Sequence, residues 1–401
     1  MIELSERVLQ LKPSSTLAVT AKARELREAG CDVVSFGAGE PDFDTPANIV
    51  EAGCQALKQG KTRYENTAGT PAARQAVADY FRQRFQRSDV RSENVIISTG
   101  AKHALYIAFM ALMNPGQELL LPAPYWVSYP AQAQLAGGTV KVIPGSLDNN
   151  FKITPEQLEK AITPQSKILM LCSPSNPAGI VYSRQELEGI AEVVLRHPQL
   201  MVFSDEIYER LVYNGLQFTS FASLSPEIAQ RTVTFNGVSK SYAMTGWRVG
   251  YAVADEAIIK AMTKLQGHMT SSITACTMPA LIEALAGPQD AVTEMVSQFA
   301  KRAEHIYKLI TAIPGLKCAQ PTGAFYILPD ISALFGKKDR EGQVLDTAAS
   351  FAQSLLKHKY VAVVPGEDFG APNHIRLSFA TSLEQIDKGL QRLKEFVEEL
   401  L

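Results

Sequence analysis

The sequence has few cysteines, and none of them are spaced as metal ligands or disulfide frameworks usually are. Only five occur among 401 residues, and no two of them form the close pair of a metal-binding motif. This wide spacing argues against a zinc site and against a fold that disulfide bonds stabilise. We therefore expect no bound metal and buried, reduced thiols at Cys31, Cys54, Cys172, Cys276 and Cys318.

A long apolar run is also lacking. The longest strongly apolar stretch covers residues 104–113, which is too short to cross a bilayer and instead predicts a buried helix. Residues 1–10 include Glu3, Glu6 and Arg7, so they lack the apolar core of a signal peptide. We expect a cytoplasmic protein without a membrane segment.

Charge of one sign is scarce as well. The 39 Lys and Arg residues nearly balance the 41 Asp and Glu residues, and the formal net charge is -2. Without a basic run, the sequence offers no electrostatic footprint for nucleic acid or for an anionic membrane, which leaves a small molecule as the expected partner. A chain of this length usually needs two domains, and ligand clefts tend to form at their seam.

What the sequence does contain is a regular alternation of apolar, strand-like runs with amphipathic, helix-like stretches. This alternation predicts an α/β fold with a mostly parallel sheet that is sandwiched by helices. Helical spacing covers residues 100–112, 155–162 and 184–195. We expect one sheet of seven strands, at residues 94–98, 118–121, 139–143, 167–172, 201–204, 232–235 and 248–253.

The pattern changes near residue 290 and predicts a smaller α+β domain. Its expected elements are a long helix, three strands and a closing helix, of which the first four cover residues 292–312, 324–328, 361–364 and 374–379. The start of the chain holds one expected helix and one short strand, at residues 18–29 and 33–36. We assign residues 46–290 to a large domain, and residues 1–45 with 291–401 to the small one.

One lysine lies in a loop of small residues, eight positions before an arginine. Lys240 and Arg248 both belong to residues 239–251 (SKSYAMTGWRVGY). A lysine amine captures carbonyl groups when its surroundings disfavour the charged form, and a fixed neighbouring cation has that effect. The planar guanidinium group of Arg248 could also donate two parallel hydrogen bonds to a phosphate. The alternative is that both are solvated surface cations, as most Lys and Arg side chains are.

Two further windows follow predicted strands. Gly100, Ala101 and Lys102 open an apolar helix, so free backbone N–H groups would face an anion such as a phosphate, although similar glycine turns occur in many α/β proteins. Asp205 ends another strand, and Tyr208 lies three residues further on. A carboxylate there can keep a pyridinium nitrogen protonated, or it can simply cap the next helix.

Three more residues have both a structural and a functional interpretation. Asn176 lies in a Pro-rich loop after a strand, which is either a rigid ligand contact or an ordinary crossover turn. Trp126 offers an indole that stacks on an aromatic ring or packs in the core. Arg376 is a cation inside an apolar strand, where a charge normally needs an anionic partner, such as a substrate carboxylate.

Together these windows resemble the class I aminotransferases of the fold-type-I pyridoxal phosphate enzymes. They are most similar to the aspartate aminotransferase branch that includes aspartate/prephenate aminotransferases. The similarity runs nearly from end to end. The segments that carry it, in order, are residues 37–46 (GAGEPDFDTP), 125–129 (YWVSY), 204–209 (SDEIYE) and 243–248 (AMTGWR).

The resemblance implies a role for each candidate residue. Lys240 would form a Schiff base with pyridoxal 5'-phosphate and move a proton from the substrate. Asp205 would pair with the pyridine nitrogen, Tyr208 and Asn176 would contact the ring oxygen, and Trp126 would stack on the ring. The phosphate would be bound by Gly100, Ala101, Lys102, Ser239, Arg248 and, from the other subunit of a homodimer with shared sites, Tyr64.

The resemblance also implies how the substrate is held. Arg376, Asn176 and the backbone of Gly39 would bind the α-carboxylate. Residues 266–277 contain no second arginine for a distal carboxylate. In this branch that duty would fall to Lys102, Thr16 and Lys12. The family also makes the peptide bonds before Pro124 and Pro177 cis.

We therefore predict a ping-pong aminotransferase that converts aspartate and 2-oxoglutarate to oxaloacetate and glutamate, with prephenate as a further acceptor that yields arogenate. One alternative is an aminotransferase that prefers aromatic or neutral amino acids. Another is a carbon–sulfur lyase of the same fold. A DNA-binding regulator with an aminotransferase-like body would need a winged-helix domain, for which the segment before Gly37 leaves no room.

Overall fold

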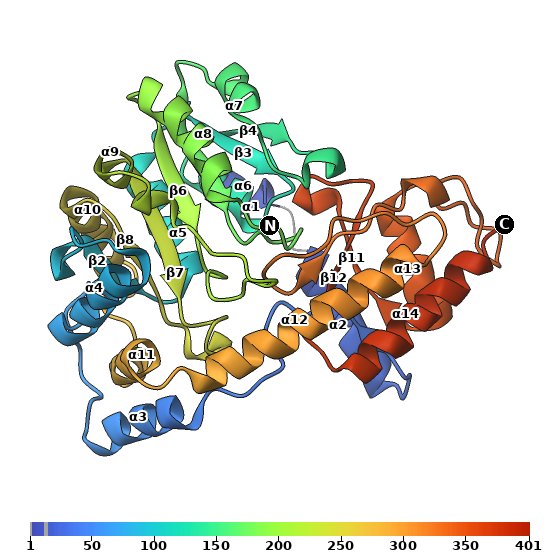
Figure 1. Cartoon of the computed structure of the whole chain (residues 1–401), viewed down its shortest axis with the longest axis horizontal. Coiled ribbons are helices and arrows are strands. Elements are labelled where there is room, and N and C mark those ends of the chain that lie inside the picture. The colour runs from blue at the N-terminus through green and yellow to red at the C-terminus, as the bar shows by residue number, and fades with distance from the viewer. Residues whose placement is uncertain (1, 12–14) are drawn as a thin grey trace.

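The computed structural model describes residues 2–11 and 15–401, with the backbone alone for residues 15–17. Its main feature is one seven-stranded sheet, at the left of Figure 1. All seven predicted strands form in it, so the predicted α/β class is confirmed. In spatial order they are β2 (Val95–Ser98), β8 (Gly250–Val253), β7 (Thr232–Gly237), β6 (Met201–Asp205), β5 (Ser166–Cys172), β3 (Glu118–Ala123) and β4 (Thr139–Pro144).

Six of these strands run in one direction. β8 is antiparallel to both of its neighbours, β2 and β7, while the remaining pairs are parallel. The carboxyl ends of six strands and the start of β8 therefore lie at the same edge of the sheet. In open α/β sheets this is the edge where ligands bind.

Helices bury both faces of the sheet. Leu119 and Leu121 of β3 pack with α5 (Ala101–Leu112) and α10 (Glu256–Gly267) on one face. Leu120, between them, packs with α8 (Arg184–Arg196) on the other. Successive side chains of a strand point to opposite faces, so a sheet covered on both sides needs apolar residues at every position. Other helices around this sheet are α3 (Ala47–Lys58), α4 (Pro71–Phe85), α6 (Ser128–Leu135), α7 (Pro155–Ala161), α9 (Pro226–Gln230) and α11 (Thr277–Ala286).

Two smaller sheets lie at the other end of the molecule. β1 (Val34–Ser35) pairs in parallel with β10 (Val361–Ala362), which joins the start of the chain to its last third. The second sheet has the order β11 (Val364–Pro365), β12 (Ile375–Ser378), β9 (Tyr326–Ile327) and is antiparallel. The single strand predicted at residues 361–364 is therefore wrong, because the chain leaves one sheet at Val363 and enters another.

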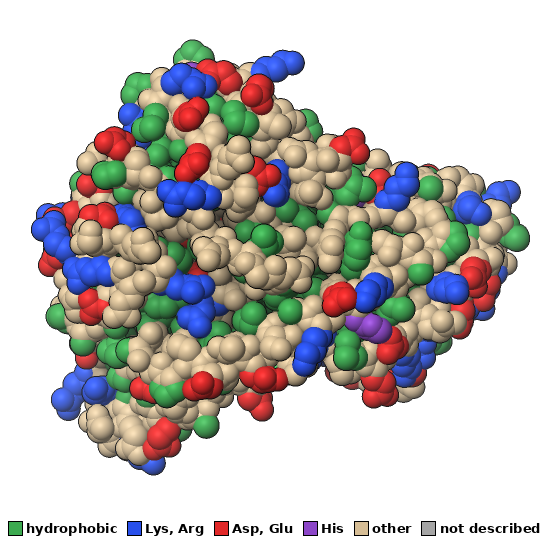
Figure 2. Space-filling view, viewed as in Figure 1, with side chains coloured by type: hydrophobic (Ala, Val, Ile, Leu, Met, Phe, Trp, Pro, Cys, Tyr) green, Lys and Arg blue, Asp and Glu red, His purple; other side chains and the backbone are tan. Residues whose placement is uncertain are grey.

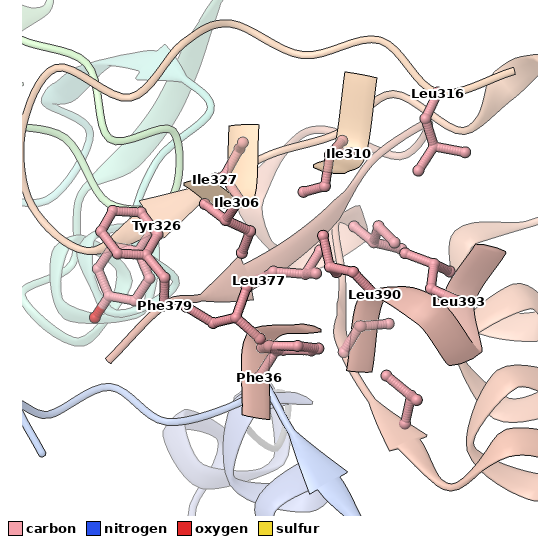
Figure 3. Packing of buried hydrophobic residues seen from close by; sticks show 14 of the residues in the cluster. Phe36, Ile306, Ile310, Leu316, Tyr326, Ile327, Leu377, Phe379, Leu390 and Leu393 are labelled. Atoms are coloured by element: carbon pink, nitrogen blue, oxygen red, sulfur yellow. The ribbon is translucent and has the colours of Figure 1, made fainter. Parts of the chain in front are cut away.

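A second hydrophobic core holds these sheets and three helices together. The helices are α12 (Asp290–Thr311), α13 (Ala348–Lys359) and α14 (Leu383–Glu398), and in Figure 1 α12 runs from the large sheet to the small ones. Figure 3 shows Ile306 and Ile310 of α12 facing Leu377 of β12 and Leu390 of α14, with Phe36 beneath. This core includes residues from both ends of the chain.

Near the N-terminus the structure differs from the predictions in three details. A short helix, α1 (Glu6–Leu9), was not predicted, and α2 (Ser15–Glu28) begins before the predicted residue 18. Cys54 is exposed on α3, where it faces away from the core formed by Ile49 and Ala56, and the other four cysteines are only partly buried. The prediction that all five thiols are buried is therefore wrong. All five cysteines are free.

Charges of both signs are interspersed on the face of the molecule in Figure 2. Within residues 2–11 and 15–401, no helix combines the length and the apolarity that crossing a membrane requires.

At the start of α5, the large sheet leaves no space for a side chain on Gly250. A Cβ atom there would lie 2.2 Å from the backbone nitrogen of Ala101 and 2.5 Å from the carbonyl carbon of Gly100. Backbone atoms in a packed sheet cannot move aside cheaply, so β8 and the first turn of α5 would separate.

We expect Gly250→Ala to lower the free energy of unfolding by about 2 kcal/mol or more, because overpacking forces the backbone to shift. Chemical denaturation measures this change. Gly246→Ala is the matched control, since a Cβ at Gly246 meets nothing within 4 Å. Equal stability of the two variants would contradict the close packing of β8 against α5.

Glu206 is a fully buried carboxyl group next to the end of β6. Its Oε1 accepts hydrogen bonds from Ser204 Oγ (2.9 Å), Ser220 Oγ (3.0 Å) and the Phe221 backbone N–H (3.0 Å), whereas its Oε2 is buried without a partner. Burial raises the pKa of Glu206 to about 8, although these three hydrogen bonds oppose the increase. The folded protein therefore holds this proton at neutral pH.

The raised pKa predicts a loss of stability as pH rises. Between the ordinary glutamate pKa of 4.5 and about 8, the folded state binds a proton that the unfolded state has released. We expect Glu206→Gln, which mimics the neutral form, to gain stability relative to the wild type by up to about 1.4 kcal/mol per pH unit from pH 5 to 8. Thermal unfolding at several pH values measures this, and a constant difference would contradict it.

Candidate active site

Most predicted site residues lie at one edge of the large sheet, because the strands that carry them end there. The residues after β2 are Gly100, Ala101 and Lys102, and Trp126 follows β3. Asn176 follows β5, Asp205 ends β6, and Tyr208 lies just beyond it. Ser239 and Lys240 follow β7, and Arg248 precedes the reversed strand β8.

Lys240 is partly buried among other cations. Its Nζ donates a hydrogen bond to the backbone carbonyl of Gly39, and it lies 6.0 Å from the centre of the Tyr208 ring. Burial lowers the pKa of Lys240 to about 8; the Glu40 carboxylate opposes this decrease, and the charges of Arg248, Arg376 and Lys102 add to it. An appreciable fraction of this amine is therefore uncharged near neutral pH, as a nucleophile requires.

Asp205 supplies a negative charge at the same edge. Its side chain is buried, and its Oδ2 accepts a hydrogen bond of 2.7 Å from the hydroxyl of Tyr129. Its Oδ1 accepts from the Ile207 backbone N–H at 3.2 Å. Burial raises the pKa of Asp205 to about 6, against the effect of these two bonds and of the Lys240 charge. The group is thus mainly a carboxylate at neutral pH.

The positive charges of Arg248 and Lys102 lie close together at the first turn of α5. A Cβ atom on Gly100 would lie 2.6 Å from Nη2 of Arg248, so the guanidinium group packs directly on this glycine. Arg248 is not in a strand as predicted, because its φ of 56° breaks the extended backbone before β8. Lys102 Nζ lies 4.7 Å from the ring of Trp126, and burial, with the Arg248 charge, lowers its pKa.

Arg376 brings a fourth cation from β12 of the small sheet. Its Nη1 donates to Asn176 Oδ1 (3.1 Å) and its Nη2 to the Gly37 carbonyl (3.2 Å), whereas its Nε is buried without a partner. The guanidinium lies 4.6 Å from the ring of Tyr326. A buried cation whose hydrogen bonds are incomplete suits an anionic ligand.

Tyr208 and Tyr326 connect the site residues of the large sheet to those of the small sheet. Both phenols are buried, and their hydroxyl oxygens lie 3.0 Å apart. Tyr208 follows β6 of the large sheet, while Tyr326 is in β9 of the small one. A Cβ atom on Gly39 would lie 3.7 Å from the Tyr326 hydroxyl, so Gly39 borders the same space.

The structure does not bring Tyr64 to this place, and it does not describe two other predicted side chains. Tyr64 is 92% exposed in the single chain. Lys12 and the side chain of Thr16 lie outside the described residues. The predicted cis peptide bonds at Ala123–Pro124 and Asn176–Pro177 are confirmed, and Ser173–Pro174 is cis as well.

The sequence analysis assigned no role to Tyr129 or Tyr326, although both contact site residues. Tyr129 lies three residues after Trp126, and its backbone N–H donates to the Trp126 carbonyl at 3.1 Å, so this spacing of three was a usable signal. Tyr326 is in a predicted strand, but nothing local marks it, because its partners are 118 and 50 positions away.

A separate hollow of about 750 Å³ has a different character. Its lining includes Arg84, Lys152 and Arg184. Each of these cations already pairs with a carboxylate, as Arg84–Glu209, Lys152–Glu186 and Arg184–Glu188. Among the described residues, no group of His, Cys, Asp and Glu is arranged to hold a metal ion.

The arrangement around Lys240 therefore combines an amine with a lowered pKa, the buried carboxylate of Asp205 and three further cations. An amine of this kind forms covalent bonds with carbonyl carbons. Arg248, which packs on Gly100, and Arg376, which donates to Asn176, suit two separate anionic groups. The carboxylate of Asp205 suits a cationic group between them.

Comparison with known proteins supports the same interpretation. The aspartate aminotransferase of Bacillus sp. is 47% identical over 394 residues, which cover 98% of this chain and 99% of that protein. The aspartate/prephenate aminotransferase of Cereibacter sphaeroides is 43% identical and covers 99% of both chains. The crystal structure of the aspartate aminotransferase from Rhizobium meliloti superposes with a TM-score of 0.96 at 37% identity, over 100% of both chains. Residues 31–393 match the family described as aminotransferase class I and II, and the chain belongs to this family of aminotransferases.

Proposed function

We propose that this aminotransferase uses pyridoxal phosphate, bound covalently through Lys240, to transfer the amino group of aspartate to 2-oxoglutarate, and that it also aminates prephenate. The observation that carries the proposal is the convergence of the Arg248, Arg376 and Lys102 charges on Lys240, whose own charge acts on the buried carboxylate of Asp205. Both the cofactor and its dicarboxylate substrates are anions, so this charge distribution suits them.

The residues present fit the cofactor. When bound, pyridoxal phosphate supplies an aldehyde that captures amines and an aromatic ring that withdraws electrons. The N–H groups of Ala101 and Lys102 at the start of α5, with Ser239 and Arg248, suit its phosphate. Trp126 offers a ring for stacking, and Tyr208 and Asn176 offer polar groups for its ring oxygen. The absence of space for a Cβ on Gly100, where Arg248 packs, supports a phosphate site there.

Each charged residue then has one task. The Lys240 amine, which donates to the Gly39 carbonyl, would hold the cofactor through its aldehyde and, when free, would move a proton away from the substrate α-carbon. The Asp205 carboxylate holds a proton on the ring nitrogen. The Arg376 guanidinium, with Asn176 and the Gly39 backbone, binds the α-carboxylate and so orients the α-carbon toward Lys240.

Substrate preference rests on the distal carboxylate. Lys102 lies over Trp126 near Arg248, and together with Lys12 and Thr16 it would bind this second anionic group. A lysine is a compact, mobile cation without the planar fork of arginine, so it tolerates carboxylates at more than one distance. The mobility of Lys102 therefore favours both aspartate and the bulkier prephenate as substrates. A large apolar side chain at position 102 would offer no charge to their distal carboxylate.

We also propose a homodimer and a division into two domains. An exposed fraction of 92% for Tyr64 is unusual for so large an aromatic side chain, and it supports a role for Tyr64 at the phosphate site of a partner subunit. The pairing of β1 with β10 supports one small domain of residues 1–45 and 291–401, beside a large domain of residues 46–290. Movement of the small domain toward the large domain would bring Arg376 to the substrate and exclude water.

The lowered pKa of Lys240 predicts how the apoprotein takes up its cofactor. Because only the uncharged amine attacks the aldehyde, the uptake rate should rise about tenfold per pH unit below pH 8 and level off above it. Stopped-flow absorbance of the covalent adduct at several pH values measures this rate.

Lys240→Ala should show no adduct and should lose amino transfer by about 10²-fold to 10⁴-fold. Lys301→Ala, an exposed lysine on α12, is the control. An adduct in Lys240→Ala would contradict the proposal.

A panel of substrates tests the specificity. Aspartate with 2-oxoglutarate should give oxaloacetate and glutamate in equal amounts with ping-pong kinetics, and prephenate should replace 2-oxoglutarate as acceptor. Lys102→Gln should raise the KM for aspartate roughly tenfold or more and that for alanine much less, because only aspartate has a distal carboxylate. Lys102→Arg, which keeps the charge, is the control. Pyruvate and ammonia as products would indicate a lyase, and a preference for alanine or phenylalanine would contradict aspartate specificity.

A further inference from the structure

The carboxylate of Asp205 has only one side-chain hydrogen-bond donor among the described residues. This donor is the hydroxyl of Tyr129, 2.7 Å from Oδ2, while the Ile207 backbone N–H binds the other oxygen at 3.2 Å. Asp205 has 4% of its surface exposed and Tyr129 has 1%. Water therefore has little access to either group, and the charge of Asp205 depends on these two donors.

Tyr129 is held in place by its own surroundings. It lies in the first turn of α6, and its ring meets that of Trp126 edge to face, at 5.3 Å between centroids and 82° between planes. Burial, followed by the charge of Asp205, raises the pKa of Tyr129 well above 10. The phenol thus keeps its proton at every pH at which the enzyme would work, and it acts only as a donor to Asp205.

We propose that Tyr129 is a positioning residue whose hydroxyl orients the Asp205 carboxylate and stabilises its charged form toward the ring nitrogen of the cofactor. This inference rests on the proposed function. The turn that leads from Trp126 into α6 would then serve the cofactor twice, because Trp126 would face the ring and Tyr129 would hold the carboxylate that binds the ring nitrogen.

The direction of the effect follows from acid–base chemistry. A carboxylate and a ring nitrogen share one proton, and the proton stays on the nitrogen while the carboxylate is the weaker base. A hydrogen bond donated to a carboxylate stabilises the charged form and makes it a weaker base. Removal of the Tyr129 hydroxyl makes Asp205 more basic, so the proton moves from the nitrogen toward the carboxylate. The ring then withdraws electrons less effectively.

Tyr129→Phe tests the proposal, because it removes the hydroxyl and keeps the ring packed against Trp126. The protein is loaded with pyridoxal phosphate labelled with ¹⁵N in the ring, and the ¹⁵N chemical shift is recorded between pH 6 and 9. We expect the variant signal to move toward the unprotonated position. We also expect kcat with aspartate to fall roughly tenfold or more while KM changes less than about twofold, since a hydrogen bond to a charged group is lost.

Tyr182→Phe is the matched control. Tyr182 is also a buried tyrosine, and its hydroxyl accepts a hydrogen bond of 2.9 Å from the Ile153 backbone N–H, away from Asp205. This variant loses a buried hydroxyl and a hydrogen bond that does not involve Asp205, so it should lose stability but keep the wild-type ¹⁵N signal. Identical ¹⁵N signals in Tyr129→Phe and the wild type would overturn the proposal and leave the proposed function intact.

A second variant keeps the test decisive if Tyr129→Phe does not fold. Replacing Tyr129 with 3-fluorotyrosine retains the hydroxyl at almost the same size and makes it a stronger donor. At a given pH it should move the ring ¹⁵N signal further toward the protonated position than in the wild type, and an unchanged signal or a shift in the opposite direction would overturn the proposal. A wild-type protein that neither binds the cofactor nor transfers an amino group would instead refute the proposed function itself.

Discussion

The site depends on one constraint, which is the common direction of six strands in the large sheet. Because these strands end at the same edge, short loops after β2, β3, β5, β6 and β7 bring residues together that are far apart in the chain. β8 is reversed, so its beginning reaches the same edge and adds Arg248. The close packing of Gly250 on the start of α5 then sets how near Arg248 lies to Gly100.

Burial gives this edge its chemical character. In a medium with little water, the charge on an amine is disfavoured by its own desolvation and by other cations nearby, and both effects act on Lys240. The same desolvation raises the pKa of Asp205, and two hydrogen bonds limit the increase. The pKa values of about 8 and about 6 therefore lie closer together than the ordinary ones, so an appreciable fraction of the amine is neutral at a pH at which the carboxylate is largely charged.

The small sheet completes the site from another part of the chain. Arg376 and Tyr326 lie on neighbouring strands, and each contacts a residue that follows a strand of the large sheet, Asn176 and Tyr208 respectively. The chain between β1 and α3 crosses from one part to the other, and Arg302 of α12 pairs with Asp42 on it at 2.6 Å. Any movement of the small sheet relative to the large one would act directly on the residues proposed to hold the substrate carboxylate.

Apolar periodicity and the position of a residue after a strand are local properties, so they predicted the fold class, the seven strands of the large sheet and most residues at its edge. Which distant groups meet depends instead on the folded chain. The hydroxyl of Tyr129 binds a carboxylate 76 positions away, and residues 361–364 divide between two sheets because separate partners, β1 and β12, pair with them. Such pairings, and the pKa shifts that burial causes, depend on packing across the whole chain, which no local pattern contains.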